Sequence, residues 1–316
     1  MSRSGAKIEL TAPDISAYRS GNTGIPYVTS FESGHPGPHV LVNALTHGNE
    51  ICGAIALDHL FRGAIRPVRG KLTLSFANVA AFQRFDPANP TASRFVDEDF
   101  NRLWDNATLD GPRHSTELAR ARLLRPLIDT VDLLLDIHSM QQSTAPLMLA
   151  GLMEKSTALA RRVGIPQFII RDAGHAAGKR MRDYGGFGDP ASPKAALLVE
   201  CGQHWEESAA TVAIETSLRF LAAAGILAAA DAQMLLARAA PPQRVIAVTD
   251  AVTITSDRFQ FCEAFRGLEC IARAGTLIAR DGAREIRTPY DDCVLIMPSR
   301  RLATGQTAVR LGRFTD

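Results

Sequence analysis

The sequence lacks an excess of either charge and lacks a long apolar run. Lys and Arg together number 35 and Asp and Glu number 33, which gives a formal net charge of +2, and no long basic run stands out. A nucleic-acid partner is therefore not expected. The longest apolar run, residues 220–230, ends after 11 residues at Asp231. It is too short to cross a bilayer, so a membrane partner is not expected either.

Cysteine is scarce, and no two cysteines form a CxxC pair. The five cysteines are odd in number and widely scattered: Cys52, Cys201, Cys262, Cys270 and Cys293. This pattern excludes a disulfide framework and predicts reduced thiols in a cytoplasmic protein. Residues 1–16 contain no apolar core segment, so we do not expect a signal peptide.

Apolar runs typical of buried strands alternate with helical spacing over the first 200 residues. The expected strands are 39–45, 71–79, 131–138, 166–172 and 195–202, and the expected helices are 50–61, 115–130 and 156–165. This alternation predicts an α/β fold with a mixed, mainly parallel sheet that is covered by helices on both faces. An Ala- and Leu-rich helical stretch at 207–239 would pack over the sheet, and Pro241 and Pro242 stop it.

After Pro242 the pattern changes to short alternating runs separated by Gly, Pro and Asp turns. This change predicts a small C-terminal all-β module. We divide the 316 residues into a large domain at 1–241 and a small β-barrel-like domain at 242–316. Residues 275–297 also resemble a biotin/lipoyl carrier, but a carrier needs a lysine, and none follows Lys194.

Two predicted strand ends carry the residues of a metal site. His47 and Glu50 follow the strand 39–45 and lie three residues apart at the start of a helix, so they project to one side. His138 ends another strand, and the carboxyl ends of parallel strands meet at one edge of a sheet. Two histidines and one glutamate with an open position form a catalytic zinc site. From its spacing alone, His47 fits a metal ligand and an ordinary buried histidine equally well. For His138 alone, an ordinary buried histidine is favoured.

Two further His-x-x-Glu pairs compete with this site. His114 and Glu117 follow Gly-Pro-Arg with no strand before them, which is typical of a solvated helix start. His204 and Glu207 do follow a predicted strand. A zinc site through His204 and Glu207 therefore stays open as an alternative.

Four motifs in the same order resemble the succinylglutamate desuccinylase/aspartoacylase family of the zinc carboxypeptidase-like superfamily. They are HGNE at 47–50, SRFVDEDFNR at 93–102, LDIH at 135–138 and LLVECG at 197–202. The resemblance extends over essentially the whole chain and includes the small β module. It implies a hydrolase with one zinc ion per chain that cleaves the amide bond of a small N-acyl amino acid.

The resemblance implies that His47, Glu50 and His138 bind zinc, that Glu200 is the general acid/base, and that Arg94 polarises the scissile carbonyl. The chemistry supports these roles. Zinc lowers the pKa of bound water and polarises a carbonyl oxygen. A glutamate can move the proton from the water to the leaving amine, and an arginine can stabilise the developing oxyanion.

The resemblance further implies that Asn101 and Arg102 hold the substrate carboxylate, because a guanidinium pairs with a carboxylate through two hydrogen bonds. Tyr290 in the β module is a candidate substrate-binding residue, and Tyr184 is a second candidate for the pocket. Asp136 lies two residues before His138 on the same strand face. It either orients that histidine or makes an unrelated structural contact.

One stretch departs from the family pattern. Aspartoacylase has an arginine shortly before its catalytic glutamate, and this arginine holds the side-chain carboxylate of the substrate. Residues 186–200 of this chain contain Lys194 as their only cation, and Pro190 lies near the expected arginine. An alternative hypothesis is a cationic side chain, as in an N-acetylated diamino acid, received by Asp189 or by Asp291 and Asp292.

Two other functions stay open. A carboxypeptidase-like peptidase would use the same chemistry, provided that the β module left the cleft open. A non-catalytic zinc- or ligand-binding protein would be marked by the loss of Glu200 or Arg94, and both residues are present. The sequence does not fix the acyl group or the amino acid, and it leaves a homo-oligomer open.

Overall fold

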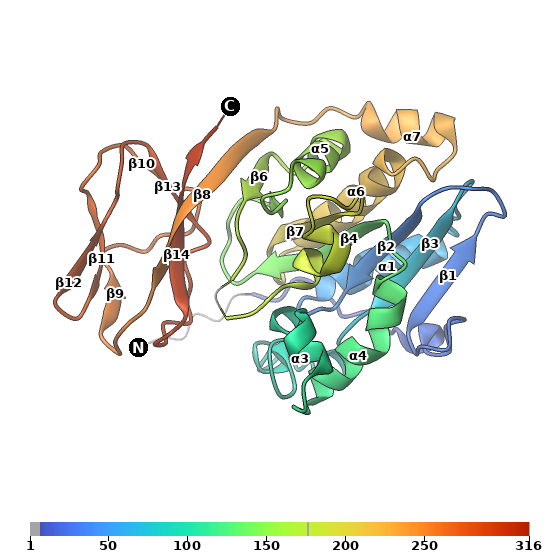
Figure 1. The fold of residues 1–316 in the computed structure, drawn as a ribbon, viewed down its shortest axis with the longest axis horizontal. Helices are drawn as coiled ribbons and strands as arrows, with labels where there is room; N and C mark the ends of the chain where they lie inside the picture. The colour runs from blue at the N-terminus through green and yellow to red at the C-terminus, as the bar shows by residue number, and fades with distance from the viewer. Residues whose placement is uncertain (1–6, 176, 316) are drawn as a thin grey trace.

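The computed structural model describes residues 7–175 and 177–315 (Figure 1). The α-helices are α1 (Ile51–Arg62), α2 (Val79–Phe82), α3 (Asn106–Asp110), α4 (Thr116–Ile128), α5 (Glu154–Val163), α6 (Glu207–Ala223) and α7 (Ala229–Leu236). The strands are β1 (Val28–Glu32), β2 (His39–Ala44), β3 (Lys71–Phe76), β4 (Leu133–Met140), β5 (Leu147–Leu149), β6 (Phe168–Arg171), β7 (Ala195–Gln203), β8 (Arg244–Thr253), β9 (Phe259–Phe261), β10 (Cys270–Ile271), β11 (Leu277–Asp281), β12 (Arg284–Arg287), β13 (Cys293–Ile296) and β14 (Thr307–Phe314). Short 3-10 helices lie at Ser16–Tyr18, Ala92–Arg94, Phe100–Arg102, Met181–Asp183 and Gly185–Phe187.

Eleven strands of the described chain form one sheet in the order β1-β3-β2-β4-β7-β5-β6-β8-β14-β13-β10, and β12, β11 and β9 form a second sheet. β3, β2, β4 and β7 are parallel, while β1 and β5 run antiparallel to their neighbours β3 and β7. β6 pairs in parallel with both β5 and β8. This mixed, mainly parallel sheet in the α/β part, with the antiparallel C-terminal strands, confirms the predicted fold class.

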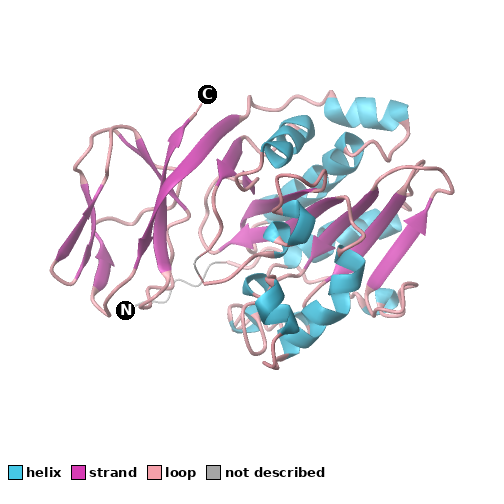
Figure 2. Cartoon of the chain, in the orientation of Figure 1, coloured by secondary structure: helices cyan, strands magenta, loops and turns pink. Residues whose placement is uncertain are grey.

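The central strands supply apolar side chains to two cores. Val40 and Val42 belong to the core under α1, α5 and α6, whereas Leu41 between them belongs to the core under α4. Successive strand residues point to opposite faces of a sheet, so a strand that is apolar throughout needs cover on both sides. The helices lie on both faces of the α/β part, as predicted (Figure 2).

Two expectations about individual elements need correction. The stretch 207–239 forms two helices, because α6 ends before Gly225, whose φ of +71° is left-handed, and α7 begins at Ala229. The pattern also failed to predict β1, β5 and β9. β5 and β9 have three residues each, and β1 lies at the sheet edge with only Val28 fully buried.

The C-terminal strands lie together beside the α/β part and carry no helix in the described residues (Figure 2). The large sheet nevertheless crosses the predicted boundary at residue 241, because β8 pairs with β6 from Phe168↔Arg244 to Arg171↔Ala247. The division into two domains stays a prediction.

The structure also bears on the expectations about the cysteines, a membrane span and the N-terminal segment. All five cysteines are described, and each is a free thiol. Among the described residues, no helix is both long and apolar enough to span a membrane. Residues 1–6, which belong to the segment searched for a signal peptide, lie outside the described residues.

The packing of α1 on the sheet predicts a strong dependence of stability on Leu57, which is 0% exposed. Leu57→Ala should lower the free energy of unfolding by about 2–5 kcal/mol, because a buried cavity replaces the side chain. Leu123→Ala on α4 is the matched control, since Leu123 is 46% exposed and its loss should cost less than about 0.5 kcal/mol. Urea unfolding measures both values. Equal losses would contradict this packing.

Candidate active site

Three strand ends bring the predicted site residues together. His47 follows β2, and Glu50 is the N-cap residue of α1. His138 lies in β4, directly opposite Glu200 in the parallel strand β7. All four side chains are at least nine-tenths buried. The edge of the sheet where β2, β4 and β7 end therefore carries a cluster of two histidines and two glutamates.

The Glu50 carboxylate lies between the two imidazoles. His47 Nδ1 is 2.8 Å from Glu50 Oε1, and His138 Nδ1 is 2.9 Å from Glu50 Oε2. Among the described residues, these three are the one group whose ligand atoms lie close enough to hold a metal ion, all within 4.8 Å of one another. Two imidazole nitrogens and a carboxylate form the donor set of many catalytic zinc sites.

The outer nitrogens of both imidazoles face carboxylates. His138 Nε2 is 2.8 Å from Asp136 Oδ2, and His47 Nε2 is 3.0 Å from Asp99 Oδ1. A carboxylate at Nε2 favours the tautomer with its proton there. At His138 the Nδ1 nitrogen then faces the Glu50 carboxylate. His47 Nε2 also lies 2.8 Å from Arg94 Nη2, which can only donate, so Asp99 does not fix the tautomer of His47. Two imidazole nitrogens and a carboxylate that converge in this way favour a cation between them. The residues present therefore fit a zinc ion.

Asp136 is fixed behind His138 by two donors. Its Oδ1 accepts hydrogen bonds from Asn43 Nδ2 and Thr46 Oγ1, each at 2.8 Å. Burial alone would raise the pKa of Asp136, but His138 and these donors hold it below its usual value. Burial likewise opposes the charged form of His138, yet Asp136 and Glu50 raise its pKa well above the usual range. This part of the site thus favours positive charge.

Glu200 is the least compensated acid of the site. Its Oε2 is buried and has no hydrogen-bond partner among the described residues. Burial raises the pKa of Glu200 to about 8, although His138 and Arg94 partly oppose the shift. A carboxyl with such a pKa can both accept and donate a proton near neutral pH. Perturbed acids of this kind concentrate at catalytic sites.

Arg94 lies against the ligand cluster. Its Nη2 is 2.8 Å from His47 Nε2 and 3.0 Å from Asp99 Oδ2, and its Nη1 is 3.4 Å from Glu50 Oε1. Burial opposes its charge, but Asp99 and Glu50 keep the pKa of Arg94 above its usual value. Arg94 is therefore a charged donor next to the His47–Glu50–His138 group.

Asn101 and Arg102 lie on the other side of His138. Asn101 accepts a hydrogen bond from Met181 N at 3.0 Å, and its Nδ2 is 3.5 Å from His138 Nε2. Arg102 Nη1 donates to the carbonyl oxygen of Asn101 at 2.6 Å. Burial lowers the pKa of Arg102 to about 10, so this guanidinium still carries its charge at neutral pH.

One pocket collects all the predicted site residues except Tyr290. His47, Glu50, His138, Glu200, Arg94, Asn101 and Arg102 line it. The C-terminal strands and their loops supply one wall, which includes Met297, Pro298 and Arg310. The β module therefore forms part of the wall of the candidate active site.

Tyr290 and Tyr184 do not line this pocket. The Tyr290 hydroxyl is 2.5 Å from Thr249 Oγ1, and Arg313 stacks over its ring. Tyr184 is 6% exposed and packs in the core under α4. Both tyrosines are placed by contacts with residues far away in the sequence, which the pattern could not predict. Neither tyrosine is therefore part of the proposed site.

The competing pair of His204 and Glu207 forms no ligand group in the described residues. His204 does line the pocket, with Nδ1 2.8 Å from Ser139 Oγ. Burial lowers its pKa to about 3. A neutral histidine therefore lines the pocket that contains the His47–Glu50–His138 group.

The environment of Glu117 differs from the predicted solvated helix start. This residue is 0% exposed, and its carboxylate accepts hydrogen bonds from Asn78 Nδ2 and from the backbone amides of Val96, Asp97 and Glu98, at 2.6 to 3.2 Å. These amides belong to the loop that carries Arg94 and Asp99. Glu117 thus holds that loop in place, and no periodicity in the sequence could have revealed it.

Comparison with known proteins gives one family and one fold. The family model described as the succinylglutamate desuccinylase/aspartoacylase catalytic domain matches residues 36–224. No curated protein sequence matches the chain. Among solved structures, succinylglutamate desuccinylase from Vibrio parahaemolyticus has a TM-score of 0.66 at 16% identity, over 92% of this chain and 87% of the other.

Two more solved structures share the fold. A succinylglutamate desuccinylase from Silicibacter sp. has a TM-score of 0.64 at 19% identity and covers 92% of this chain and 89% of its own. The product-bound ectoine utilization protein EutE (DoeB) from Ruegeria pomeroyi has a TM-score of 0.60 at 18% identity, over 90% and 88%. At such identities the likeness establishes the fold alone.

The Glu117 contacts predict that Glu117→Gln loosens the loop at residues 96–98. The Gln amide would face backbone donors, and each unsatisfied buried group costs about 1–3 kcal/mol. Hydrogen exchange at Val96, Asp97 and Glu98 should become at least about tenfold faster. Glu154→Gln, at the exposed start of α5, should leave these amides unchanged. Unaltered exchange in Glu117→Gln would refute the anchoring role.

The raised pKa of Glu200 predicts a pH-dependent stability in metal-free protein. The folded state binds the Glu200 proton more tightly than the unfolded chain, whose carboxyl has a pKa of 4.5. Its contribution to stability is therefore lost as the pH rises from about 4.5 to about 8. Glu200→Gln should gain stability relative to the native chain between pH 5 and pH 8. A difference that is constant or falls over this range would contradict the burial of an uncompensated carboxyl.

Proposed function

Since the chain belongs to the succinylglutamate desuccinylase/aspartoacylase family, as its four motifs predicted, we propose that it is a zinc-dependent hydrolase of the amide bond in a small N-acyl amino acid. The observation that carries this proposal is the buried Glu200 carboxyl, which faces the His47–Glu50–His138 group across adjacent strands. A proton-transfer group and a metal-ligand group together are what amide hydrolysis needs.

His47 Nδ1, His138 Nδ1 and the Glu50 carboxylate would hold the zinc ion. The tautomer of His138 that Asp136 favours supports this assignment. A zinc ion there would supply a Lewis acid and lower the pKa of a water molecule.

Glu200 moves the proton. Its pKa of about 8 is close to the pH at which proton transfer is most efficient. The carboxylate accepts a proton from the attacking water as the carbonyl carbon is attacked. The resulting carboxylic acid then donates that proton to the leaving nitrogen when the C–N bond breaks, which restores the carboxylate.

Arg94 and the Asn101–Arg102 pair bind the substrate. The Arg94 guanidinium stabilises the negative charge that develops on the former carbonyl oxygen, a contribution worth about 3–4 kcal/mol for one well-placed donor. Arg102 pairs with the α-carboxylate of the amino acid. The β-module wall of the pocket favours a small acylated amino acid over a peptide, and therefore favours a deacylase over a carboxypeptidase-like peptidase.

Zinc content tests the ligand assignment. The native chain should bind about one zinc ion, the expected content of a single catalytic site, and His138→Ala should lose most of it. His204→Ala is the matched control, since His204 is equally buried in the same pocket, and it should keep its zinc. Loss of zinc in His204→Ala with retention in His138→Ala would move the site to the competing pair.

Hydrolysis of a panel of N-acyl amino acids tests the role of Glu200. Glu200→Gln should keep its zinc but lower kcat by about 10²–10⁴-fold, because general acid–base catalysis contributes that much. Glu263→Gln, an exposed position in the β module, should have native kcat. Native kcat in Glu200→Gln would remove the proposed mechanism.

A further inference from the structure

The connection between β13 and β14, residues 297–306, forms one side of the pocket, and we call it the wall loop. Five of its residues line the pocket: Met297, Pro298, Ser299, Arg301 and Gln306. Pro298 is buried, whereas every position from Arg300 to Gln306 is exposed. The wall loop therefore presents one face to the candidate active site and the other to solvent.

Backbone hydrogen bonds fix the two ends of the wall loop. Ser299 N donates to Ala308 O at 2.7 Å, and Gly305 N donates to Ile254 O at 2.8 Å. The chain turns at Gly305 with a left-handed φ of +83°, which glycine adopts without strain. Among the described residues, positions 300–304 make no backbone hydrogen bond to a segment outside the loop. The middle of the wall loop therefore depends on side-chain contacts.

Gln142 supplies such a contact from the α/β part. It lies in the loop between β4 and β5. Its Nε2 donates to the carbonyl oxygen of Pro298 at 2.9 Å, and its Oε1 accepts a hydrogen bond from Arg300 Nη2 at 3.1 Å. Among the described residues, these are the hydrogen bonds that join the wall loop to the α/β part. Both polar atoms of one amide are therefore used to fix the wall loop.

A second contact holds the C-terminal module in place without Gln142. Thr144 Oγ1 donates a hydrogen bond to the carbonyl oxygen of Arg266. Gly267 follows with a φ of +117°, and a Cβ atom there would lie 3.0 Å from Thr144 Cγ2, so this corner packs tightly on the loop between β4 and β5. β8 also continues the large sheet beside β6. Loss of the Gln142 contact should therefore loosen the wall loop and leave the module docked.

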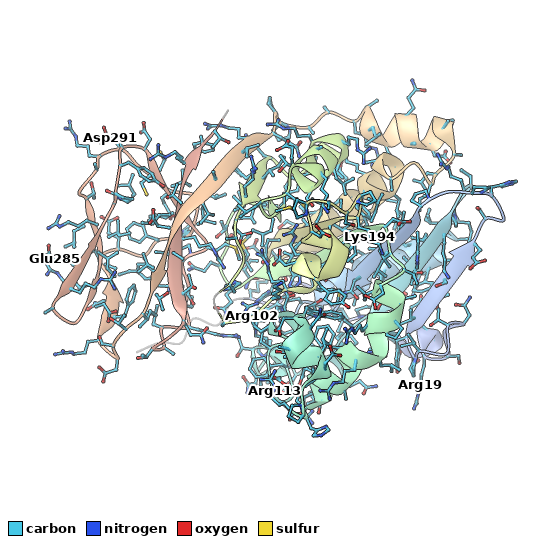
Figure 3. All side chains as sticks on the ribbon, viewed as in Figure 1. Arg19, Arg102, Arg113, Lys194, Glu285 and Asp291 are labelled. Carbon is cyan, nitrogen blue, oxygen red and sulfur yellow. The ribbon has the colours of Figure 1, made fainter. Side chains whose placement is uncertain are left out.

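Arg102 enters the pocket from the α4 face of the sheet. Phe100 and Leu103, on either side of the Asn101–Arg102 pair, pack in the core under α4. Figure 3 shows Arg102 close to α3, which contacts α4. The end of the pocket that Arg102 forms therefore lies on this face.

Gln142 lies at the other end of the pocket. Its loop follows β4, where the carbonyl oxygen of Met140 accepts a hydrogen bond from His204 N at 2.8 Å. Trp205, next to His204, packs in the core under α1, α5 and α6, on the opposite face of the sheet. Arg301 of the wall loop reaches the same end, because it adds to the effect of burial in lowering the pKa of His204. His204, Gln142 and the wall loop thus enclose this end.

In the proposed function, the α-carboxylate of the substrate binds Arg102 and the scissile carbonyl lies beside Arg94. The acyl chain leaves the carbonyl carbon on the side opposite to the nitrogen, so it extends toward the end that Gln142 and the wall loop enclose. We propose that Gln142 is a specificity-determining residue, which limits the length of the acyl chain by fixing the wall loop and so selects short acyl groups such as formyl and acetyl. This inference rests on the proposed function, because it concerns the acyl end of the same site.

A series of straight-chain acyl groups tests this inference in the zinc-loaded full-length chain. The substrates are the N-formyl, N-acetyl, N-butyryl and N-hexanoyl derivatives of aspartate and of asparagine. The kcat/KM of the native chain should be at least about 100-fold higher for acetyl than for hexanoyl, since a few surplus methylenes in a closed pocket suffice for such a ratio. Gln142→Met keeps the length of the side chain and removes both hydrogen bonds, so it should lower this ratio at least about tenfold.

Ser143→Ala is the matched control, since Ser143 is exposed in the same loop and does not line the pocket, and it should keep the native ratio. Equal hydrolysis of the acetyl and hexanoyl derivatives by the native chain, or an unchanged ratio in Gln142→Met, would overturn the inference and leave the deacylase proposal intact. No hydrolysis of any derivative would contradict the proposed function instead.

A spin label on the wall loop gives a readout that needs no turnover. The label is attached at Leu302→Cys, an exposed position, in a chain with Cys262→Ser and Cys270→Ser, because these two thiols are exposed. The label should move faster in Gln142→Met than in Ser143→Ala, and equal mobility would overturn the role of Gln142 even in an inactive protein. Calorimetric affinities for N-acetylaspartate and N-hexanoylaspartate would then decide the acyl preference, since equal affinities would overturn it and a preference for acetyl that is lost in Gln142→Met would support it.

Discussion

The Glu50 carboxylate between two imidazoles is the contact on which the rest of the site depends. It exists because β2 and β4 are parallel neighbours whose ends bring His47 and His138 to opposite sides of the first residue before α1. Two imidazoles and a carboxylate that converge in a buried space favour a bound positive charge, and the raised pKa of His138 reflects this preference. The hydrogen bonds that Asn43 and Thr46 donate to Asp136 serve this arrangement. They hold the Asp136 carboxylate at Nε2 of His138, which leaves Nδ1 of His138 toward the proposed metal position.

The arginines of the pocket differ in how closely carboxylates neutralise their charge. Arg94 and Arg180 have carboxylate partners within 3.0 Å, so their positions are fixed by the protein itself. Arg102 and Arg310 lack such partners among the described residues, apart from the distant Asp172, and are therefore available to a ligand. In the proposed function, Arg94 would stabilise the transition state and the less compensated Arg102 would bind substrate.

Much of the candidate site could be predicted from the sequence, because the signals that identify its residues are local. Strand ends, helix starts and three-residue spacing brought His47, Glu50 and His138 into one candidate group, and the family motifs added Glu200, Arg94, Asn101 and Arg102. Residues that depend on long-range packing could not be predicted in the same way. The sequence pattern predicts Glu117 as part of a solvated helix start, yet Glu117 anchors the loop that carries Arg94 and Asp99. Arg310 reaches the pocket only because β8 and β14 continue the large sheet.

The central claim is that zinc binds between His47 Nδ1, His138 Nδ1 and the Glu50 carboxylate. Anomalous diffraction at the zinc absorption edge, from crystals of the zinc-loaded protein, tests it most directly. The account predicts one strong peak in contact with these three groups, with Asp136 and Asp99 still bound to the outer nitrogens. A peak beside His204 and Glu207, or the absence of a peak from the Glu50 site in zinc-saturated protein, would contradict it.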